Sequence, residues 1–173
     1  MRRVYQFGSM AHEEFEEFLR TFERPMLRLC YRLLGNMADA QDAAQETFLK
    51  AFRNFGAFDR SRAPSPWIYQ IAVNTCRDRM RRRCGWSELS DGLASGASSP
   101  EFDAQRAEQR RMVMEGLGEL GEKERMALVL RDLEGLETAE VARILGSSEE
   151  TVRSQVSTAR GKLRRYVEAR MRG

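Results

Sequence analysis

The chain has 173 residues, of which 32% are charged and 9% aromatic, and its formal net charge is +3 with a sequence pI near 9.0. The length allows one domain or two small ones, and the composition indicates a soluble, mostly helical protein whose small net charge does not by itself indicate a nucleic-acid partner. Because it has neither a long apolar run nor a signal peptide, we expect no membrane insertion and a cytoplasmic location.

In the first part of the chain, apolar residues recur at helical spacing from about Ala11 onward. Residues 1–10 show no period and are predicted to form a flexible arm, with an alternative start of the chain as the other reading. An apolar face begins near Ala11, and Pro25 is expected to open a second helical segment, because proline is tolerated in the first turn of a helix. Gly35 ends that segment, and a third helix is predicted over about 38–52.

The predicted helix 38–52 has many small side chains on its inner face, so it packs closely against its neighbours and leaves an acidic and amide face for a partner. A polar loop follows over 54–64. Phe55 is predicted to fold back into the core, whereas Phe58 is either a core residue or a surface on which an unpaired base stacks. A fourth helix, 65–83, offers a polar and basic face.

Periodicity stops over 84–103, which is rich in serine and glycine and contains no lysine or arginine. This composition is typical of a flexible linker between domains. Beyond it, the apolar pattern predicts helices over 104–117, 122–133 and 138–145. The sequence therefore predicts an all-α fold with two small helical domains, 11–83 and 104–173, joined by a flexible linker.

The stretch 147–165 reads as one amphipathic helix with polar and basic side chains outside its apolar stripe. Ser147 is predicted to be the N-cap, with Glu150 as the reciprocal carboxylate of a capping box. Together with the short helix before it and the turn at Gly146, this stretch predicts that the second domain ends in a helix-turn-helix. A merely solvated helix is the alternative, but the combination of features favours DNA binding.

No catalytic or metal-binding arrangement is visible. The three cysteines, Cys30, Cys76 and Cys84, lack metal-ligand spacing, and His12 is the single histidine, so we expect no metal and no cofactor. Cys30 is predicted to be a core residue, and a redox role for Cys76 and Cys84 is the less favoured alternative. The chain has no glycine-rich phosphate loop and no nucleophile elbow, which argues against an enzyme.

Three segments, DAQDAAQETFLKAF, PWIYQIAVNTCRDRMRRR and LRDLEGLETAEVARILGSSEETVRSQVSTARGKLR, resemble the extracytoplasmic-function group of bacterial sigma factors in the sigma-70 family. The resemblance covers about 15–83 and 117–166, and it is specific because the order, the spacing and the intervening linker all agree. It implies a transcription initiation factor, without enzymatic activity of its own and monomeric when free, that binds core RNA polymerase. It also implies an anti-sigma factor that holds the two domains inactive.

The resemblance assigns the first domain to sigma region 2 and the second to sigma region 4. It places polymerase docking at Asp39, Asp42, Gln45, Glu46, Phe48 and Leu49. It places recognition of the melted −10 element at Phe58, Asn74, Arg77, Arg81 and Arg82. It places recognition of the duplex −35 element at Arg153, Ser154, Ser157, Arg160 and Lys162. Aromatic and basic residues suit an unpaired strand, and polar side chains on a recognition helix suit base edges.

The chain departs from the family pattern at several positions. Pro64, Ser65 and Pro66 stand where the family often has an aromatic residue and a threonine, and Gln70 replaces a frequent arginine. On the recognition helix, Gln155, Ser157 and Thr158 also differ from the common pattern. The alternative function is a stand-alone helix-turn-helix repressor or activator with an N-terminal dimerisation or sensor domain.

Overall fold

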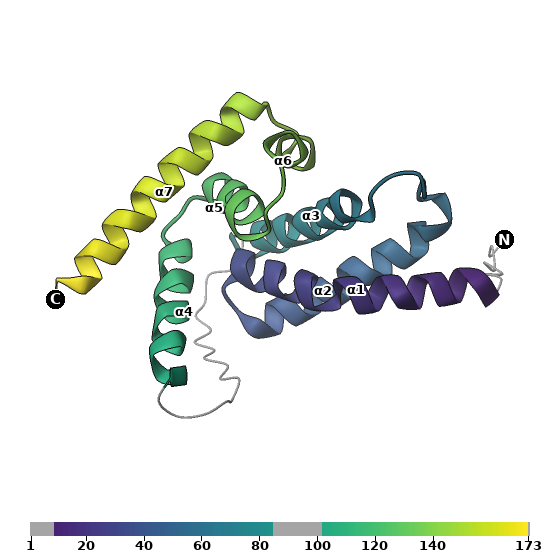
Figure 1. Cartoon of the computed structure of the whole chain (residues 1–173), viewed down its shortest axis with the longest axis horizontal. Coiled ribbons are helices and arrows are strands. Elements are labelled where there is room, and N and C mark those ends of the chain that lie inside the picture. Colours follow the sequence, from purple (N-terminus) through teal and green to yellow (C-terminus); the bar gives the residue numbers. More distant parts are fainter. Residues whose placement is uncertain (1–8, 85–101, 173) are drawn as a thin grey trace.

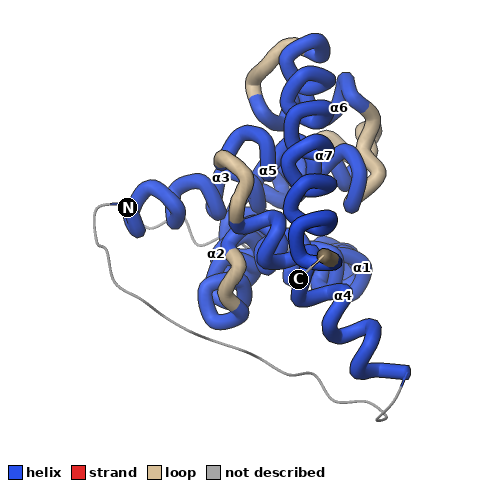
Figure 2. The backbone as a smooth tube through the Cα atoms, turned by 90° about the vertical axis from the view of Figure 1, so that its left-hand side faces the viewer, coloured by secondary structure: helices blue, strands red, loops and turns tan. Residues whose placement is uncertain are grey.

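The computed structural model describes residues 9–84 and 102–172, and every regular element within these ranges is a helix (Figures 1 and 2). The α-helices are α1 (Ser9–Leu34), α2 (Met37–Asn54), α3 (Pro64–Cys84), α4 (Phe102–Gly118), α5 (Glu122–Leu128), α6 (Thr138–Leu145) and α7 (Glu149–Met171). A 3-10 turn, η1 (Phe55–Ala57), follows α2, and a π-helical segment, η2 (Val129–Leu133), follows α5. The predicted all-α class is confirmed. Most of the predicted arm and linker lies outside the described residues.

Helix α1 is continuous through Pro25, so the prediction that this proline opens a separate segment is wrong. The reason is packing: Phe18, Phe22, Met26 and Leu29 form one stripe on both sides of the proline, and all four are buried. Burying this stripe outweighs the backbone hydrogen bond that a proline inside a helix gives up.

The N-terminal unit, α1 to α3, is built around an aromatic cluster. Phe55 is 6% exposed, and its ring lies 5.0 Å from that of Phe15 in an edge-to-face arrangement. This confirms that Phe55 folds back into the core. Helix α2 begins at its N-cap Asn36, whose side chain accepts from the Asp39 backbone N–H at 3.0 Å. Its small buried residues let it approach α1 and α3 closely, as the sequence predicted; these are Ala40, Ala43, Ala44 and Ala51.

Cys30 and Cys76 are both fully buried in this unit. A hydrogen bond with Cys30, together with burial, raises the pKa of the Cys76 thiol. A thiol without thiolate character is a poor nucleophile, so these two residues act as small core side chains. The side chain of Cys84 lies outside the described residues.

The C-terminal unit, α4 to α7, contains the helix-turn-helix. The predicted helix 122–133 is α5 followed by η2, where the Glu134 N–H donates to the Val129 carbonyl at 2.9 Å. Helix α6 ends at Gly146, which has a φ of +63° and takes the left-handed conformation that glycine adopts without strain.

The N-cap of α7 is Ser148, so the prediction of Ser147 with Glu150 is wrong by one residue. The Ser148 hydroxyl accepts from the Thr151 N–H at 3.1 Å. Ser147 belongs instead to the end of α6, where its N–H donates to the Ala142 carbonyl at 2.9 Å. The helix itself is longer than predicted and reaches Met171.

The C-terminal end of α4 packs against the C-terminal half of α7, whereas the start of α4 points away from it (Figure 1). Gly116 allows this approach, because a Cβ atom there would lie 2.7 Å from Leu163 Cδ2. Glu115 joins the two helices by accepting from the Tyr166 hydroxyl at 2.9 Å and from Arg170 at 2.6 Å. No helix in the part of the chain that the structure describes is long and apolar enough to cross a membrane.

Candidate nucleic-acid and partner interfaces

The exposed face of α2 borders a groove of about 700 Å³ against α1. Four of the six residues predicted to dock on polymerase line it, namely Asp42, Gln45, Phe48 and Leu49. Leu49 is 52% exposed and is one of four large apolar side chains that are exposed among the described residues. The opposite wall is apolar and comes from α1, with Phe15, Leu19 and Leu27. An apolar groove with a polar rim is the surface that a helix of another protein fits.

Asp39 and Glu46 do not line this groove. Asp39 lies in the first turn of α2, where a carboxylate is favoured by the helix dipole. Glu46 faces α3 and pairs with Lys50 at 2.9 Å and with Arg79 at 3.2 Å. The hydrogen bond from Lys50, the largest cause, helps to lower the pKa of the Glu46 carboxyl, so it stays ionised.

Arg79 is a residue that sequence reasoning missed. It lies on the face of α3 turned toward α2, is 23% exposed, and pairs with Asp42 at 3.6 Å as well as with Glu46. The sequence signal was its position between Arg77 and Arg81, where a helix turns a residue to a different face. Arg79 therefore connects the candidate docking helix to the candidate DNA-facing helix.

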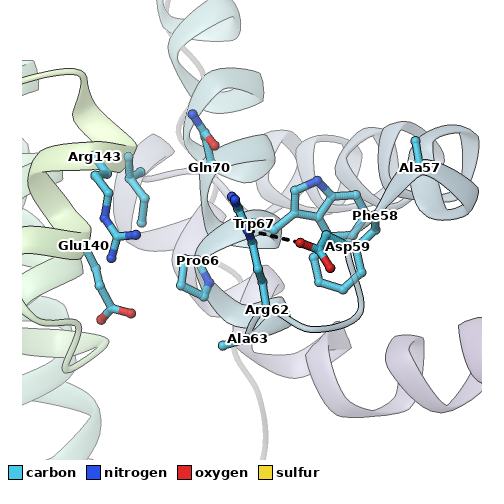
Figure 3. Close-up of a pocket in the computed structure, with 11 residues that line it drawn as sticks. Ala57, Phe58, Asp59, Arg62, Ala63, Pro66, Trp67, Gln70, Glu140 and Arg143 are labelled. Carbon is cyan, nitrogen blue, oxygen red and sulfur yellow. Dashed lines mark ion pairs between the residues drawn. The ribbon is translucent and has the colours of Figure 1, made fainter.

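Phe58 is half-buried and lies over Trp67, with ring centroids 4.6 Å apart and planes inclined by 31°. Both rings border a cavity of about 740 Å³ between α3 and α6 (Figure 3). Asp59 lines the same cavity and pairs with Arg62 at 3.3 Å. Hydrogen bonds from the Ser61 hydroxyl and backbone lower the pKa of the Asp59 carboxyl. Aromatic rings beside a carboxylate acceptor are groups that can hold a base.

The outer face of α3 carries the other predicted −10 residues. Asn74, Arg81 and Arg82 are exposed, and Gln70, one turn before Asn74, is exposed beside them. Arg77 differs, because its guanidinium lies 3.4 Å from the Glu122 carboxylate. The structure thus presents three of the four predicted α3 residues to solvent and turns Arg77 toward α5.

On α7, the structure brings Arg153, Ser154 and Ser157 to one exposed face, as a recognition helix requires. Arg153 is paired with Glu149 at 2.7 Å within the same helix. Such exposed pairs are weak and can exchange partners when another acceptor arrives.

Arg160 and Lys162, also predicted to face DNA, pair within the protein. Arg160 binds Asp132 at 2.7 Å, and Lys162 binds Glu124 at 2.7 Å. The hydrogen bond from Lys162 lowers the pKa of Glu124, and the bond to Asp132 raises the pKa of Arg160. The acidic partners gave no local signal in the sequence, because they come from elements 28 and 38 residues earlier.

Glu140 and Arg143 are two further residues that sequence reasoning missed. Both belong to α6, yet Figure 3 shows them on the side of the cavity opposite Pro66 and Gln70 of α3. The first helix of the helix-turn-helix therefore forms one wall of the cavity that contains Phe58 and Trp67. Residues so far apart in the chain share no sequence period, so the sequence does not predict that they border one cavity.

Comparison with known proteins gives matches to both units. Residues 18–84 match the family description "Sigma-70 region 2" and residues 110–163 match "Sigma-70, region 4". The chain is 29% identical to the ECF RNA polymerase sigma factor SigW of Bacillus subtilis over 96% of this chain and 95% of SigW. It is 33% identical to ECF sigma factor SigM of Mycobacterium tuberculosis over 88% of this chain and 76% of SigM.

A solved structure shares the fold. Sigma factor RpoE of Bartonella quintana, in complex with the anti-sigma factor NepR, superposes with a TM-score of 0.76 at 22% identity, over 90% of this chain and 98% of that one.

Proposed function

The chain belongs to the extracytoplasmic-function group of RNA polymerase sigma factors, and from this premise we propose how its two helical units divide the work of initiation. A sigma factor directs promoter-specific transcription by binding core polymerase, recognising the −35 and −10 elements and assisting melting. In our proposal residues 11–83 act as region 2 and residues 104–173 as region 4, with 84–103 between them. The polymerase supplies the chemistry, and this chain has no catalytic activity of its own.

The observation that carries the polymerase-docking part is the groove between α1 and α2. An exposed Leu49 and, two helical turns before it, the Asp42 carboxylate line the same groove, so the groove offers an apolar anchor with a polar group at its rim, an arrangement that can concentrate binding energy in a few contacts. Gln45 and Phe48 extend the same face. Asp39 and Glu46 act at its edge, Glu46 through its pairs with Lys50 and Arg79.

The α3 face is proposed to hold the melted −10 strand. Phe58 and Trp67 provide the stacking surface for a base taken out of the duplex, and Asn74 provides hydrogen bonds to an exposed base edge. Arg81 and Arg82 attract the backbone phosphates of that strand. Arg77 joins them once its contact with Glu122 is released.

The exposed face of α7 is proposed to read the duplex −35 element. Arg153, Ser154 and Ser157 reach base edges in the major groove, while Arg160 and Lys162 lie toward phosphates. The serines are short, so this helix makes few strong base contacts, and docking to polymerase supplies much of the affinity for the promoter.

The remaining partners follow from the same premise. Because the polymerase and its promoters lie in the bacterial cytoplasm, the factor works there, as a monomer until it binds the polymerase. An anti-sigma factor is the proposed inhibitor, supported by the sequence resemblance and by the RpoE–NepR complex of the same fold.

Reconstitution of purified chain, core polymerase and a promoter library tests this function. We expect run-off transcripts only when core polymerase and this chain are both present. Leu49→Asp is expected to weaken binding to core by about tenfold or more, because it places a charge at the apolar anchor. Val113→Asp is the matched control, since Val113 is 42% exposed on α4 and lies outside the groove.

Two results would overturn the proposal at different points. A chain that neither binds core nor yields transcripts, but binds duplex DNA tightly as a dimer, is a stand-alone regulator. A Leu49→Asp variant that binds core as well as the Val113→Asp variant would show that the docking face lies elsewhere.

A further inference from the structure

The exposed face of α7 continues beyond the residues that are proposed to read the −35 element. Its exposed side chains recur at intervals of three and four residues and form one line along the helix, with Arg153, Ser157, Arg160 and Arg164. Arg165 lies beside Arg164, and both are exposed. In the part of the chain that the structure describes, neither of these two arginines has a carboxylate partner.

Two other cations in this half of α7 are engaged within the protein. Lys162 pairs with Glu124 at 2.7 Å, and Arg170 pairs with Glu115 at 2.6 Å. These ion pairs hold α7 against α5 and α4, which accounts for both cations. Among the described residues, no such pair accounts for the two adjacent arginines. Neighbouring guanidinium groups without a counterion form a surface that attracts an anionic partner.

Gly161 lies on the same side of α7, in the interior of the helix, and is exposed. Glycine lowers the stability of a helix relative to alanine, so a glycine at this position calls for a reason. Packing among the described residues supplies none, because a Cβ atom at Gly161 would meet no atom within 4 Å. Gly116 differs, since a Cβ atom there would lie 2.7 Å from Leu163 Cδ2. Gly161 therefore suits a partner outside the chain that comes close to the helix backbone.

The spacing along α7 matches the width of a DNA major groove. Ser157, at the proposed base-reading position, precedes Gly161 by four residues, which is about 6 Å along the helix axis at ~1.5 Å per residue. The major groove is about 12 Å wide, so a helix that crosses it meets the sugar–phosphate rim about 6 Å from the centre of the groove. Gly161 lies where that rim passes, and Arg164 and Arg165 lie just beyond it.

We propose that one sugar–phosphate strand of the duplex next to the −35 element passes over Gly161 and is held by Arg164 and Arg165. The backbone of duplex DNA carries one negative charge per about 1.7 Å of its axis, which complements the two cations. Glu168, exposed one turn after Arg164, would repel a phosphate, so the DNA-binding surface ends before it. The inference rests on the proposed function, because the −35 reader sets where the DNA lies.

These contacts carry no base information. They add affinity and fix the position of α7 in the groove, because phosphates look alike in every sequence. Their loss is therefore expected to weaken binding to any duplex, whereas loss of a base contact changes the preference for one sequence.

A salt titration tests the two arginines. The full chain, assembled with core polymerase, binds a fluorescent duplex that contains the −35 element and no −10 element. Arg164→Gln and Arg165→Gln should each lower the slope of log K against log salt concentration by about one. The double variant should weaken binding at ~0.1 M salt by about tenfold or more, and equally for the −35 sequence and a scrambled duplex. Arg20→Gln is the matched control and should keep the slope, because Arg20 lies on α1 with 82% of its side chain exposed.

Variants of Gly161 separate DNA contact from folding. Gly161→Ala should raise the Tm of the free chain, because alanine favours the helix, and should nevertheless weaken binding to the duplex. Gly161→Leu should weaken binding further, by about tenfold, since the longer side chain holds the strand away from the helix. Ala169→Leu is the matched control and should bind like the wild type, because Ala169 is exposed on a different face of α7.

Three results would overturn the inference. If the arginine variants keep the wild-type slope, these side chains contact no phosphate, and if their loss of affinity is confined to the −35 sequence, they contact bases instead. If Gly161→Leu binds as tightly as Ala169→Leu, no strand passes over Gly161. Failure of the proposed function would look different, because the wild-type holoenzyme itself would then not prefer the −35 sequence to the scrambled duplex.

Discussion

Arg160 of α7 forms two hydrogen bonds with Asp132 of η2, from Nε to Oδ2 and from Nη2 to Oδ1, each 2.7 Å long. The sequence predicted that Arg160 faces a DNA phosphate. The two roles are compatible, because 63% of the Arg160 side chain remains exposed. Asp132 then fixes the guanidinium in one orientation at the surface and reduces the entropy lost on binding.

This arrangement predicts different effects for the two partners on binding of the holoenzyme to −35 duplex. Arg160→Ala should lower the slope of log K against log salt concentration by about one, because one phosphate contact is lost. Asp132→Asn should weaken binding less and leave the slope unchanged, since the cation remains. A salt titration by fluorescence anisotropy measures both. An unchanged slope for Arg160→Ala would mean that Arg160 contacts no phosphate and only joins α7 to η2.

Glu124 gives the C-terminal unit a predictable response to acid. Its pKa lies below the ordinary value of 4.5, mainly because Lys162 donates a hydrogen bond to the carboxylate. Its contribution to stability is therefore present above pH 4.5 and is lost as the pH falls through the lower pKa of the folded state. Glu124→Gln should be less stable than the wild type near neutral pH, and the difference should shrink below pH 4.5.

Urea unfolding followed at several pH values checks this prediction. The informative control is the Lys162→Met background, where the effect of Glu124→Gln and its pH dependence should both become smaller. If the loss of stability is the same at all pH values, the ion pair is not its source.

Leu29 tests whether the aromatic and aliphatic core of α1 stabilises the N-terminal unit. Its side chain is fully buried, so Leu29→Ala removes apolar contacts and leaves a cavity. The expected loss is about 2–5 kcal/mol in the free energy of unfolding. Val113→Ala, at an exposed position, should change it by about 0.5 kcal/mol or less. Denaturant midpoints measure both, and a loss at Leu29 no greater than at Val113 would contradict the packing described for α1.

Much of the local structure could be predicted from the sequence because its causes are local. The small residues of α2 and the turn at Gly146 follow from side-chain size and backbone freedom. The cap of α7 was missed by one residue because two serines are adjacent, and the choice between them depends on a hydrogen bond from Ser147 to Ala142. The path of α1 through Pro25 depended on tertiary burial, which propensity does not include.

The candidate surfaces also have a part that the sequence predicts and a part that it does not predict. The exposed faces of α3 and α7 follow from helical spacing, which placed Asn74 and Ser157 on the surface as predicted. Pairs between distant elements left no such signal. Arg32 and Glu134 are 102 residues apart, and no period in the chain relates them. Such pairs are set by how the units pack, so they emerge only from the structure.

The role proposed for Asn74 can be separated from the role of α3 as a scaffold. Asn74 is exposed, and alanine has the higher helix propensity, so Asn74→Ala should fold normally. It should bind core polymerase like the wild type, yet lower the permanganate reactivity of thymines in the melted −10 region, because the strand loses a hydrogen-bonding partner. Asp78→Ala is the matched control, since Asp78 is exposed on the next turn of α3. Equal losses in the two variants would indicate a general effect on the helix, and unchanged reactivity in Asn74→Ala would remove this residue from strand recognition.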